Sequence, residues 1–313
     1  MKRGNVTAAD LASSVLAVPP LARNDDLSLA EDANRALIAH LQHGGVTTLM
    51  YGGNANFYNI GLAEYAPLLD FLAAAVAPDT WVIPSAGPDF GKLMDQARVL
   101  RERDFPTAMV LPLGFPATPD GVERGIRAFA DAFGKPVIVY IKNDGYLAPA
   151  HVERLDRAGC VAAVKYAVVR ADPAVDPFLA ELVQRFDRTR IVSGIGERPA
   201  IVHLRDFGLQ AFTSGSVCVA PRGSTALLAA LNCHDYATAE RVRRAYLPLE
   251  DLRDALSPLR VLHEAVTLAG IADMGPMLPM LSNLDVSSHP RVRAAATALL
   301  THDRTLAAQH AMA

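Results

Sequence analysis

The chain has 313 residues, of which 51% are hydrophobic, so it can bury a large core. Its formal net charge is −3 without a dense block of lysine and arginine, which argues against nucleic acid and anionic membranes as partners. Three cysteines at irregular spacing suit a reducing compartment. After the basic residues 1–5, Asp10 and the prolines Pro19 and Pro20 interrupt any apolar signal core, and no uninterrupted apolar run reaches membrane length. We therefore expect a cytoplasmic protein.

From residue 14 onward, short apolar runs alternate with longer amphipathic ones, which is typical of strands and helices around a parallel sheet. The expected strands cover residues 14–18, 46–51, 81–84, 108–111, 136–140, 159–169, 190–194 and 210–213. Helical spacing covers residues 29–43, 90–103, 120–133, 149–158, 176–186 and 198–207. Eight strands in near-regular alternation indicate an α/β fold of the (β/α)8 TIM-barrel type.

The pattern changes after Thr213, where only helical periods follow, over residues 224–231, 236–256, 257–269 and 290–309. We expect residues 1–223 to form the barrel, with a catalytic site at the C-terminal ends of its strands. Residues 224–313 are expected to form a C-terminal helical extension that includes the last barrel helix.

One lysine, Lys165, stands in the otherwise apolar run of residues 159–169, which reads as a strand buried on both faces. A lysine kept out of water loses part of its preference for the charged form, so its amine can attack a carbonyl near neutral pH. That is the chemistry of a Schiff-base enzyme. The alternative is a lysine at the rim of the strand whose ammonium reaches solvent along its flexible stem.

Other strand ends also carry polar residues. The run 52–56 contains Gly53, Asn54 and Asn56, whose backbone N–H groups could hold a carboxylate, unless the run is a plain tight turn. Tyr140 ends the strand before that of Lys165 and could pass protons within the same cavity, unless it is a core tyrosine with a satisfied hydroxyl. Lys142 follows two residues later.

The last two strands end in small polar residues. Ser193 and Gly194 open an isolated Gly-x-Gly that lacks the rest of a dinucleotide motif, so we interpret it as a close approach of backbone to ligand or to a neighbouring loop. Thr213 closes the ring after the eighth strand. The nine histidines lie mostly on amphipathic helices, and the sequence has neither a zinc-binding His-Glu-x-x-His nor a Gly-x-Ser-x-Gly turn. We expect no metal and no cofactor.

With these residues in place, the chain resembles the dihydrodipicolinate synthase and N-acetylneuraminate lyase family of class I aldolases over nearly its full length. Residues 136–140 are similar to the strand that bears the family's catalytic tyrosine. Residues 161–165 are similar to the strand that bears its Schiff-base lysine, and the downstream Ser193-Gly194 also fits. The resemblance implies a barrel with three C-terminal helices, commonly assembled as a tetramer. It also implies an imine between Lys165 and a 2-oxo acid, proton transfer by Tyr140, and a carboxylate held by the Gly53-Asn54 segment.

The chain departs from the family at three places. The usual Gly-Thr-Thr-Gly-Glu or Gly-Ser-Thr-Gly-Glu is replaced by residues 52–56, Gly-Gly-Asn-Ala-Asn, which lack the paired hydroxyls. The tyrosine that the synthases carry after strand four has no counterpart in residues 111–115. The Asn-x-Pro-x-Arg continuation after the tyrosine becomes residues 141–145, Ile-Lys-Asn-Asp-Gly, without the arginine. We therefore do not expect a true dihydrodipicolinate synthase.

Our hypothesis from the sequence is a class I lyase, an aldolase or dehydratase, that acts on a 2-oxo acid such as pyruvate or a 2-keto-3-deoxy sugar acid. Lys165 and Tyr140 are the expected catalytic residues. The expected substrate-binding residues are Gly53, Asn54, Asn56, Lys142, Ser193, Gly194 and Thr213. Two alternatives stay open: a non-catalytic relative that binds a small acid, and a metal-dependent class II aldolase on a similar barrel. We expect a homotetramer or homodimer whose partner is the small-molecule substrate.

Overall fold

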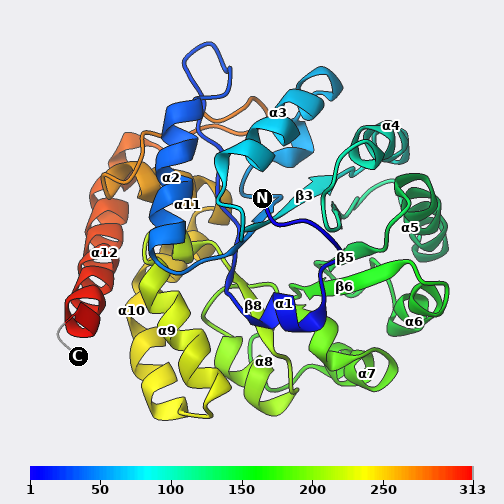
Figure 1. Ribbon diagram of the computed structural model, residues 1–313. Helices are drawn as coiled ribbons and strands as arrows, with labels where there is room; N and C mark the ends of the chain where they lie inside the picture. The colour runs from blue at the N-terminus through cyan, green and yellow to red at the C-terminus, as the bar shows by residue number, and fades with distance from the viewer. Residues whose placement is uncertain (312–313) are drawn as a thin grey trace.

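In the computed structural model, which describes residues 1–311, a closed barrel of eight parallel strands occupies the centre (Figure 1). The strands are neighbours in chain order, and the last pairs with the first. They are β1 (Leu16–Ala17), β2 (Thr48–Tyr51), β3 (Trp81–Ala86), β4 (Met109–Val110), β5 (Val137–Ile141), β6 (Val161–Tyr166), β7 (Ile191–Ser193) and β8 (Ala211–Ser214). The predicted (β/α)8 barrel is confirmed, and each strand lies within or close to its predicted range.

Helices surround the strands (Figure 1). Those between the strands are α2 (Glu31–His43), α3 (Leu62–Ala75), α4 (Phe90–Arg101), α5 (Pro119–Phe133), α6 (Pro149–Arg157), α7 (Pro177–Arg185) and α8 (Ala200–Asp206). Short 3-10 turns are η1 (Phe57–Asn59), η2 (Arg188–Arg190), η3 (Ser216–Cys218) and η4 (Val286–Ser288). Capping side chains begin several helices: the side chains of Asp89, Thr118 and Asp176 accept hydrogen bonds from the backbone of the first turn.

Two helices have no counterpart among the predicted elements. Helix α3 contains Pro67 and is apolar on nearly every side, so its sequence lacks the polar stripe that reveals a surface helix. The other is α1 (Ala8–Ala12), a short helix closed by a capping box in which Thr7 and Asp10 bind each other's backbone N–H groups. Helix α1 packs against η2 and β8, and Lys2 lies 4.6 Å from the centre of the Trp81 ring at the start of β3. The N-terminal segment therefore crosses the N-terminal end of the barrel, which faces the viewer in Figure 1.

Four helices follow the barrel: α9 (Pro221–Asn232), α10 (Tyr236–Ala255), α11 (Pro258–Leu268) and α12 (His289–Ala311). They gather on one side of the barrel, where α10 packs against the other three (Figure 1). The predicted boundary after residue 223 falls inside α9, and the division into barrel and extension stays a prediction. Within the described residues, none of the helices has the length and apolar character needed to cross a membrane.

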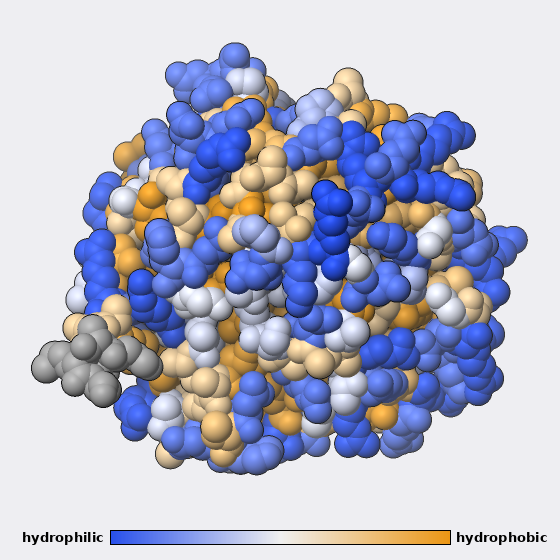
Figure 2. Space-filling view, viewed as in Figure 1, coloured by the Kyte–Doolittle hydropathy of each residue, from blue (hydrophilic) through white to orange (hydrophobic). Residues whose placement is uncertain are grey.

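Figure 2, seen from the same side, shows hydrophilic residues over most of the outer helices and hydrophobic atoms mainly between them. This distribution follows from helices that turn an apolar stripe toward the sheet and a polar face toward solvent.

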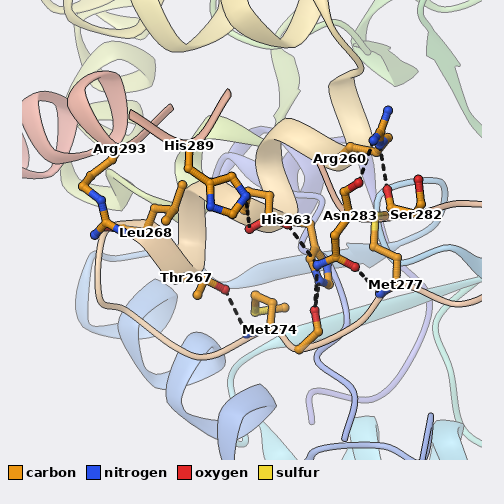
Figure 3. Close-up of polar contacts among 12 residues, drawn as sticks. Arg260, His263, Thr267, Leu268, Met274, Met277, Ser282, Asn283, His289 and Arg293 are labelled. Atoms are coloured by element: carbon orange, nitrogen blue, oxygen red, sulfur yellow. Dashed lines mark hydrogen bonds and ion pairs between the residues drawn. The ribbon is translucent and has the colours of Figure 1, made fainter. Parts of the chain in front are cut away.

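The connector between α11 and α12, residues 269–288, has a dense set of polar contacts (Figure 3). Arg260 donates two hydrogen bonds of 2.6 Å to the backbone oxygens of Ser282 and Asn283. The buried ring of His263 lies 2.9 Å from the Gly275 oxygen. The Asn283 amide binds Glu264 at 2.9 Å, and its oxygen accepts from the Met277 N–H. Side chains of α11 and of the connector itself thus fix an otherwise irregular segment.

Candidate active site

The side chain of Lys165 lies on β6, directly beside Tyr140 on β5. Residues that pair across parallel strands point to the same face of the sheet, and Tyr140 pairs with Lys165. This pairing depends on a register shift, because Val137 pairs with Val161 whereas Ile138 pairs with Ala163. The extra residue, Ala162, moves Lys165 into register with Tyr140. The local irregularity therefore aligns the two side chains that the sequence singled out.

The Lys165 amine is nearly out of contact with water, with 5% of the residue exposed. Its Nζ lies 4.5 Å from the centre of the Tyr140 ring. Burial, and then the nearby positive charges of Lys142 and Arg253, lower the pKa of Lys165 to about 7. Within residues 1–311, the amine has neither a hydrogen-bond nor an ion-pair partner. A buried, unpaired amine that is largely neutral at physiological pH is a competent nucleophile.

A cavity of about 260 Å³ opens at this end of the barrel, lined by Lys165 and by residues that follow several strands. Seven of the predicted site residues border it: Gly53, Asn54, Tyr140, Lys142, Lys165, Gly194 and Thr213. Burial raises the pKa of Tyr140 to about 12, so this phenol keeps its proton at neutral pH. The active sites of such barrels lie at the C-terminal ends of the strands, which is where this cavity lies.

The Gly53-Asn54 segment, which follows β2, presents backbone donors to the cavity. Neither backbone N–H of the two residues donates a hydrogen bond within the described chain. The Asn54 side chain turns away to donate to the Val18 oxygen at 2.9 Å. The segment therefore offers its backbone N–H groups for an anion, whereas its amide side chain fixes the loop.

Gly194 lies against the stem of Lys165. A Cβ atom at this position would lie 3.0 Å from the Lys165 Cγ and 2.8 Å from both the Ala167 Cβ and the Tyr166 oxygen. Only glycine leaves the lysine stem undisturbed here. The predicted close approach of the backbone at Gly194 is thus made to the lysine itself.

Two predicted binding residues lie outside the cavity. Ser193 is fully buried, and its Oγ lies 2.8 Å from the Nδ1 of His203, a ring whose pKa burial lowers to about 4. Asn56 accepts a hydrogen bond from Asn59 and donates one of 3.4 Å to the Leu278 oxygen in the connector. Both side chains support the loops around the cavity, so we no longer include them among the substrate-binding candidates.

Thr213 and Lys142 border the cavity in different ways. The Oγ1 of Thr213 is buried and has no hydrogen-bond partner in the described part of the chain. Lys142 is exposed and likewise makes no hydrogen bond or ion pair with residues 1–311. Each therefore keeps its polar atom free for a ligand.

Sequence reasoning missed several residues that line the cavity, among them Tyr58, Glu250 and Arg253. Tyr58 lies in η1, and its pKa is raised first by burial and then by the neighbouring Tyr140 and Tyr146. Glu250 and Arg253 come from α10, outside the eight strands and the loops that follow them. Their helix reads as an ordinary amphipathic surface helix, so the sequence carried no signal for them.

Glu250 forms a buried pair with Glu197, which follows β7. The Glu250 Oε1 accepts a hydrogen bond of 3.0 Å from the Glu197 N–H, and Ser224 donates one of 2.5 Å to the Glu197 Oε1. Burial, and then the charge of Glu197, raise the pKa of Glu250 well above its usual range. Burial beside a second carboxyl group therefore disfavours the charged form of Glu250.

Two other features of the described chain lie away from the lysine cavity. Among residues 1–311, a single group of side chains could share a metal ion: Asp120, Glu123 and His151 on α5 and α6. None of them borders the lysine cavity, and each already pairs with a neighbour, such as Glu123 with Arg154. A larger and mainly apolar hollow of about 680 Å³ lies beside α4 and α5, but it contains neither Lys165 nor Tyr140. The chemistry therefore points to the lysine cavity.

A closed parallel barrel with a buried lysine on β6 defines the fold class: a (β/α)8 barrel. The chain is similar in structure to dihydrodipicolinate synthase from Bacillus clausii, with a TM-score of 0.82 and 21% identity. That match covers 93% of this chain and 98% of the other.

Two further solved structures share this architecture. Sialic acid aldolase from Ruminococcus gnavus has a TM-score of 0.81 at 13% identity, covering 94% of this chain and 99% of that one. A prophage protein of the dihydrodipicolinic acid synthase family from E. coli K12, solved with pyruvate, has a TM-score of 0.78 at 20% identity, covering 91% and 98%. No protein-family model and no curated protein matches the chain. The chain thus has the fold of the family that its sequence resembles.

Proposed function

We propose that the protein is a divergent member of the dihydrodipicolinate synthase and N-acetylneuraminate lyase family. In this proposal it is a class I lyase, an aldolase or dehydratase, that forms a Schiff base between Lys165 and a 2-oxo acid. The observation that carries the proposal is the Lys165 amine, which is buried, unpaired and lowered in pKa to about 7, beside Tyr140 in a cavity at the strand ends. A structural lysine would have a carboxylate or carbonyl partner.

In the reaction, the neutral Nζ attacks the C2 carbonyl, and the oxygen leaves as water to give a protonated imine. In a cleavage, the C4 hydroxyl gives its proton to the Tyr140 oxygen, the electrons of the C3–C4 bond move into the imine, and an aldehyde leaves while a three-carbon enamine stays on Lys165. In a dehydration, the imine instead loses a C3 proton to give an enamine of the intact chain, and the C4 hydroxyl takes up a proton as it is expelled, so that it leaves as water. A single imine therefore serves both reactions.

Tyr140 and the Gly53-Asn54 segment take supporting roles. The Tyr140 phenol keeps its proton at neutral pH, so it can donate to the oxygen that leaves as water and recover the proton later. The free N–H groups of Gly53 and Asn54 hold the substrate carboxylate. Thr213 and Lys142 offer further polar contacts at the edge of the cavity.

Borohydride trapping tests the proposal. Wild-type protein incubated with pyruvate and borohydride should gain the mass of pyruvate minus one oxygen atom, as read by intact mass. Lys165→Ala should gain nothing. Lys135→Met is the matched control, because Lys135 donates to the Phe105 oxygen away from the cavity and should leave trapping unchanged. Absence of a Lys165-dependent adduct across a panel of 2-oxo acids would overturn the proposal.

The pH dependence of trapping sharpens the test. Because the neutral amine is the nucleophile, the initial rate with cyanoborohydride should rise with a midpoint near pH 7, following the lowered pKa of Lys165. A lysine of ordinary pKa would place this midpoint above pH 10. Rates measured from pH 5.5 to 10.5 separate the two cases.

The replaced run of residues 52–56 favours a second candidate, a non-catalytic protein that binds a small acid. Without the paired hydroxyls, the cavity could hold an acid and catalyse nothing. A ligand that raises the melting temperature of wild type and Lys165→Ala equally, without adduct or turnover, would favour this candidate. Assembly as a homotetramer or homodimer and a cytoplasmic location stay predictions, the first open to mass photometry.

A further inference from the structure

We infer that the cavity takes a 2-oxo acid with a second anionic group, and that Arg253 of α10 is the specificity-determining residue that binds this group. The inference rests on the proposed imine chemistry and narrows its substrate class. It starts from the charges that line the cavity.

The cavity wall carries more positive than negative charge. Its basic side chains, besides the largely neutral Lys165, are those of Lys142, Arg198 and Arg253, and its acidic ones are those of Glu250 and Asp254. Arg198 is neutralised by ion pairs of 2.5 Å to Asp251 and 3.4 Å to Asp254. Arg253 and Lys142 have no ion pair within residues 1–311. Two unneutralised cations therefore border the space around the nucleophile.

Glu250, three residues before Arg253 on α10, forms no ion pair with it. This carboxyl is buried against Glu197, and its pKa is raised well above its usual range, first by burial and then by the charge of Glu197. A side chain at Gly196 would collide with the Glu250 Oε1 at 2.3 Å and approach the Arg253 Nη1 at 3.9 Å, so both groups crowd this glycine. Because Glu250 makes no ion pair with Arg253, the charge of Arg253 remains available to a ligand.

The Arg253 guanidinium is held in place without being saturated. Its Nε donates to the Pro258 oxygen at 3.3 Å, and its Nη1 donates to the Ser216 Oγ at 3.4 Å. The Nη2 lies over Gly215, where a Cβ atom would come within 2.7 Å of it, and donates no hydrogen bond within the described residues. A half-buried arginine with a fixed plane and a free donor suits a carboxylate.

The cavity has room for such a substrate. Its volume of about 260 Å³ equals that of roughly nine water molecules at about 30 Å³ each, more than a three-carbon acid fills. The first carboxylate is assigned to the N–H groups after β2, and the carbonyl carbon lies at Lys165 on β6. Arg253, which stands over the residues after β8, is left for the far end of the molecule.

A matched pair of acids tests the inference. 2-Oxoglutarate and 2-oxopentanoate have the same chain length and differ by a terminal carboxylate in place of a methyl group. In borohydride trapping, we expect wild-type protein to be half-saturated by 2-oxoglutarate at a concentration about 10- to 100-fold lower than by 2-oxopentanoate. Equal half-saturation by the two acids would overturn the inference.

Three variants test whether Arg253 causes the preference for 2-oxoglutarate over 2-oxopentanoate. In Arg253→Met, the half-saturating concentrations of the two acids should differ by no more than about threefold, while pyruvate is still trapped. Arg253→Lys keeps the charge and should retain part of the preference, which guards against a folding defect in the first variant. Arg198→Met is the control, because Arg198 borders the same cavity but is already ion-paired. A preference that survives Arg253→Met and is lost in Arg198→Met would contradict the assignment.

A second readout keeps this test separate from the proposed function. In Lys165→Met, which cannot form an imine, 2-oxoglutarate should raise the melting temperature more than 2-oxopentanoate does, and the difference should vanish when Arg253→Met is added. If no protein traps pyruvate but this difference is present, the imine chemistry fails and the anion site stands. If pyruvate is trapped but the difference and the trapping preference are both absent, the anion site fails alone.

Discussion

The lysine cavity and the connector between α11 and α12 are both rich in polar groups outside regular structure, and they treat those groups in opposite ways. In the connector, Arg260 and Asn283 bind backbone and side-chain partners at 2.6 to 3.0 Å. In the cavity, Lys165 and the Thr213 hydroxyl have no partner within residues 1–311. The polar groups of the connector stabilise the fold, whereas Lys165 and the Thr213 hydroxyl in the cavity are left without a hydrogen-bond or ion-pair partner in the described chain.

The difference matters because an unpaired buried polar group costs folding free energy, whereas a paired one stabilises modestly. Such a cost is retained where a ligand supplies the missing partner. The comparison therefore predicts that substitutions in the cavity change the trapping of 2-oxo acids and remove the folding cost of an unpaired polar group. Substitutions in the connector should change the free energy of unfolding alone.

The largest expected effect is the pH dependence of stability in Lys165→Met. The pKa of Lys165 is lowered from 10.5 to about 7 in the folded protein, so protonation in the folded state is penalised as the pH falls between these values. The stability that wild type has at pH 10 is lost progressively down to pH 7, by about 3–5 kcal/mol relative to the variant. Urea unfolding of both proteins at pH 10 and pH 6.5 measures this loss of stability. Parallel pH profiles would show that the lysine is not buried as described.

The second effect is kinetic. Gly194→Ala should slow the trapping of pyruvate by roughly 100-fold, because a Cβ atom 3.0 Å from the Lys165 Cγ displaces the nucleophile. Gly61→Ala is the matched control, since a Cβ at Gly61 meets nothing within 4 Å and the residue has φ −71°. Equal trapping rates for the two variants would remove Gly194 from the site.

In the connector, Asn283→Ala should lower the free energy of unfolding by about 1–3 kcal/mol, since the amide loses its bonds to Glu264, Gly275 and Met277. Trapping of pyruvate per folded molecule should be unchanged. Ser282→Ala serves as the control, because Arg260 binds only the Ser282 backbone oxygen. A loss of trapping in Asn283→Ala would break the proposed division between the two regions.

A further effect on stability is expected for Glu250→Gln. Because the folded-state pKa of Glu250 is raised above 4.5, its contribution to stability is complete at low pH and declines as the pH rises. Glutamine does not ionise, so the variant should match wild type in its urea midpoint near pH 4.5 and exceed it at pH 8. A variant that is less stable than wild type at pH 8 would mean that Glu250 is charged in the fold.

The predicted barrel was confirmed because strands buried on both faces leave continuous apolar runs, and their alternation with helical periods fixes the class. The sequence alone also singled out Lys165 and Tyr140, one charged and one phenolic group at the ends of adjacent apolar strands. Their direct pairing could not be read in advance, because it depends on the extra residue at Ala162 in β6. The insertion of a single alanine cannot be recognised from the composition or the periodicity of a sequence.

The other half of the cavity escaped sequence reasoning for a different reason. Arg253 and Glu250 lie on α10, and they reach the cavity only because α10 packs beside the barrel. Helical periodicity in a sequence identifies the apolar face of a helix, but it does not identify the part of the protein that the polar face contacts. Ser193, conversely, lies at the end of the expected strand, yet its hydroxyl is bound to His203 on α8.

The position of Arg253 in the chain also sets the order in which the two sides of the lysine cavity are synthesised. During synthesis, the ribosome releases all eight strands, Lys165 included, before α10 emerges. At about 5–20 residues per second, a nascent chain passes through an interval of seconds in which the amine exists and its anion-binding wall does not. Under the proposal that Arg253 binds the second anionic group of the substrate, the growing protein acquires its selectivity for the acid after its nucleophile.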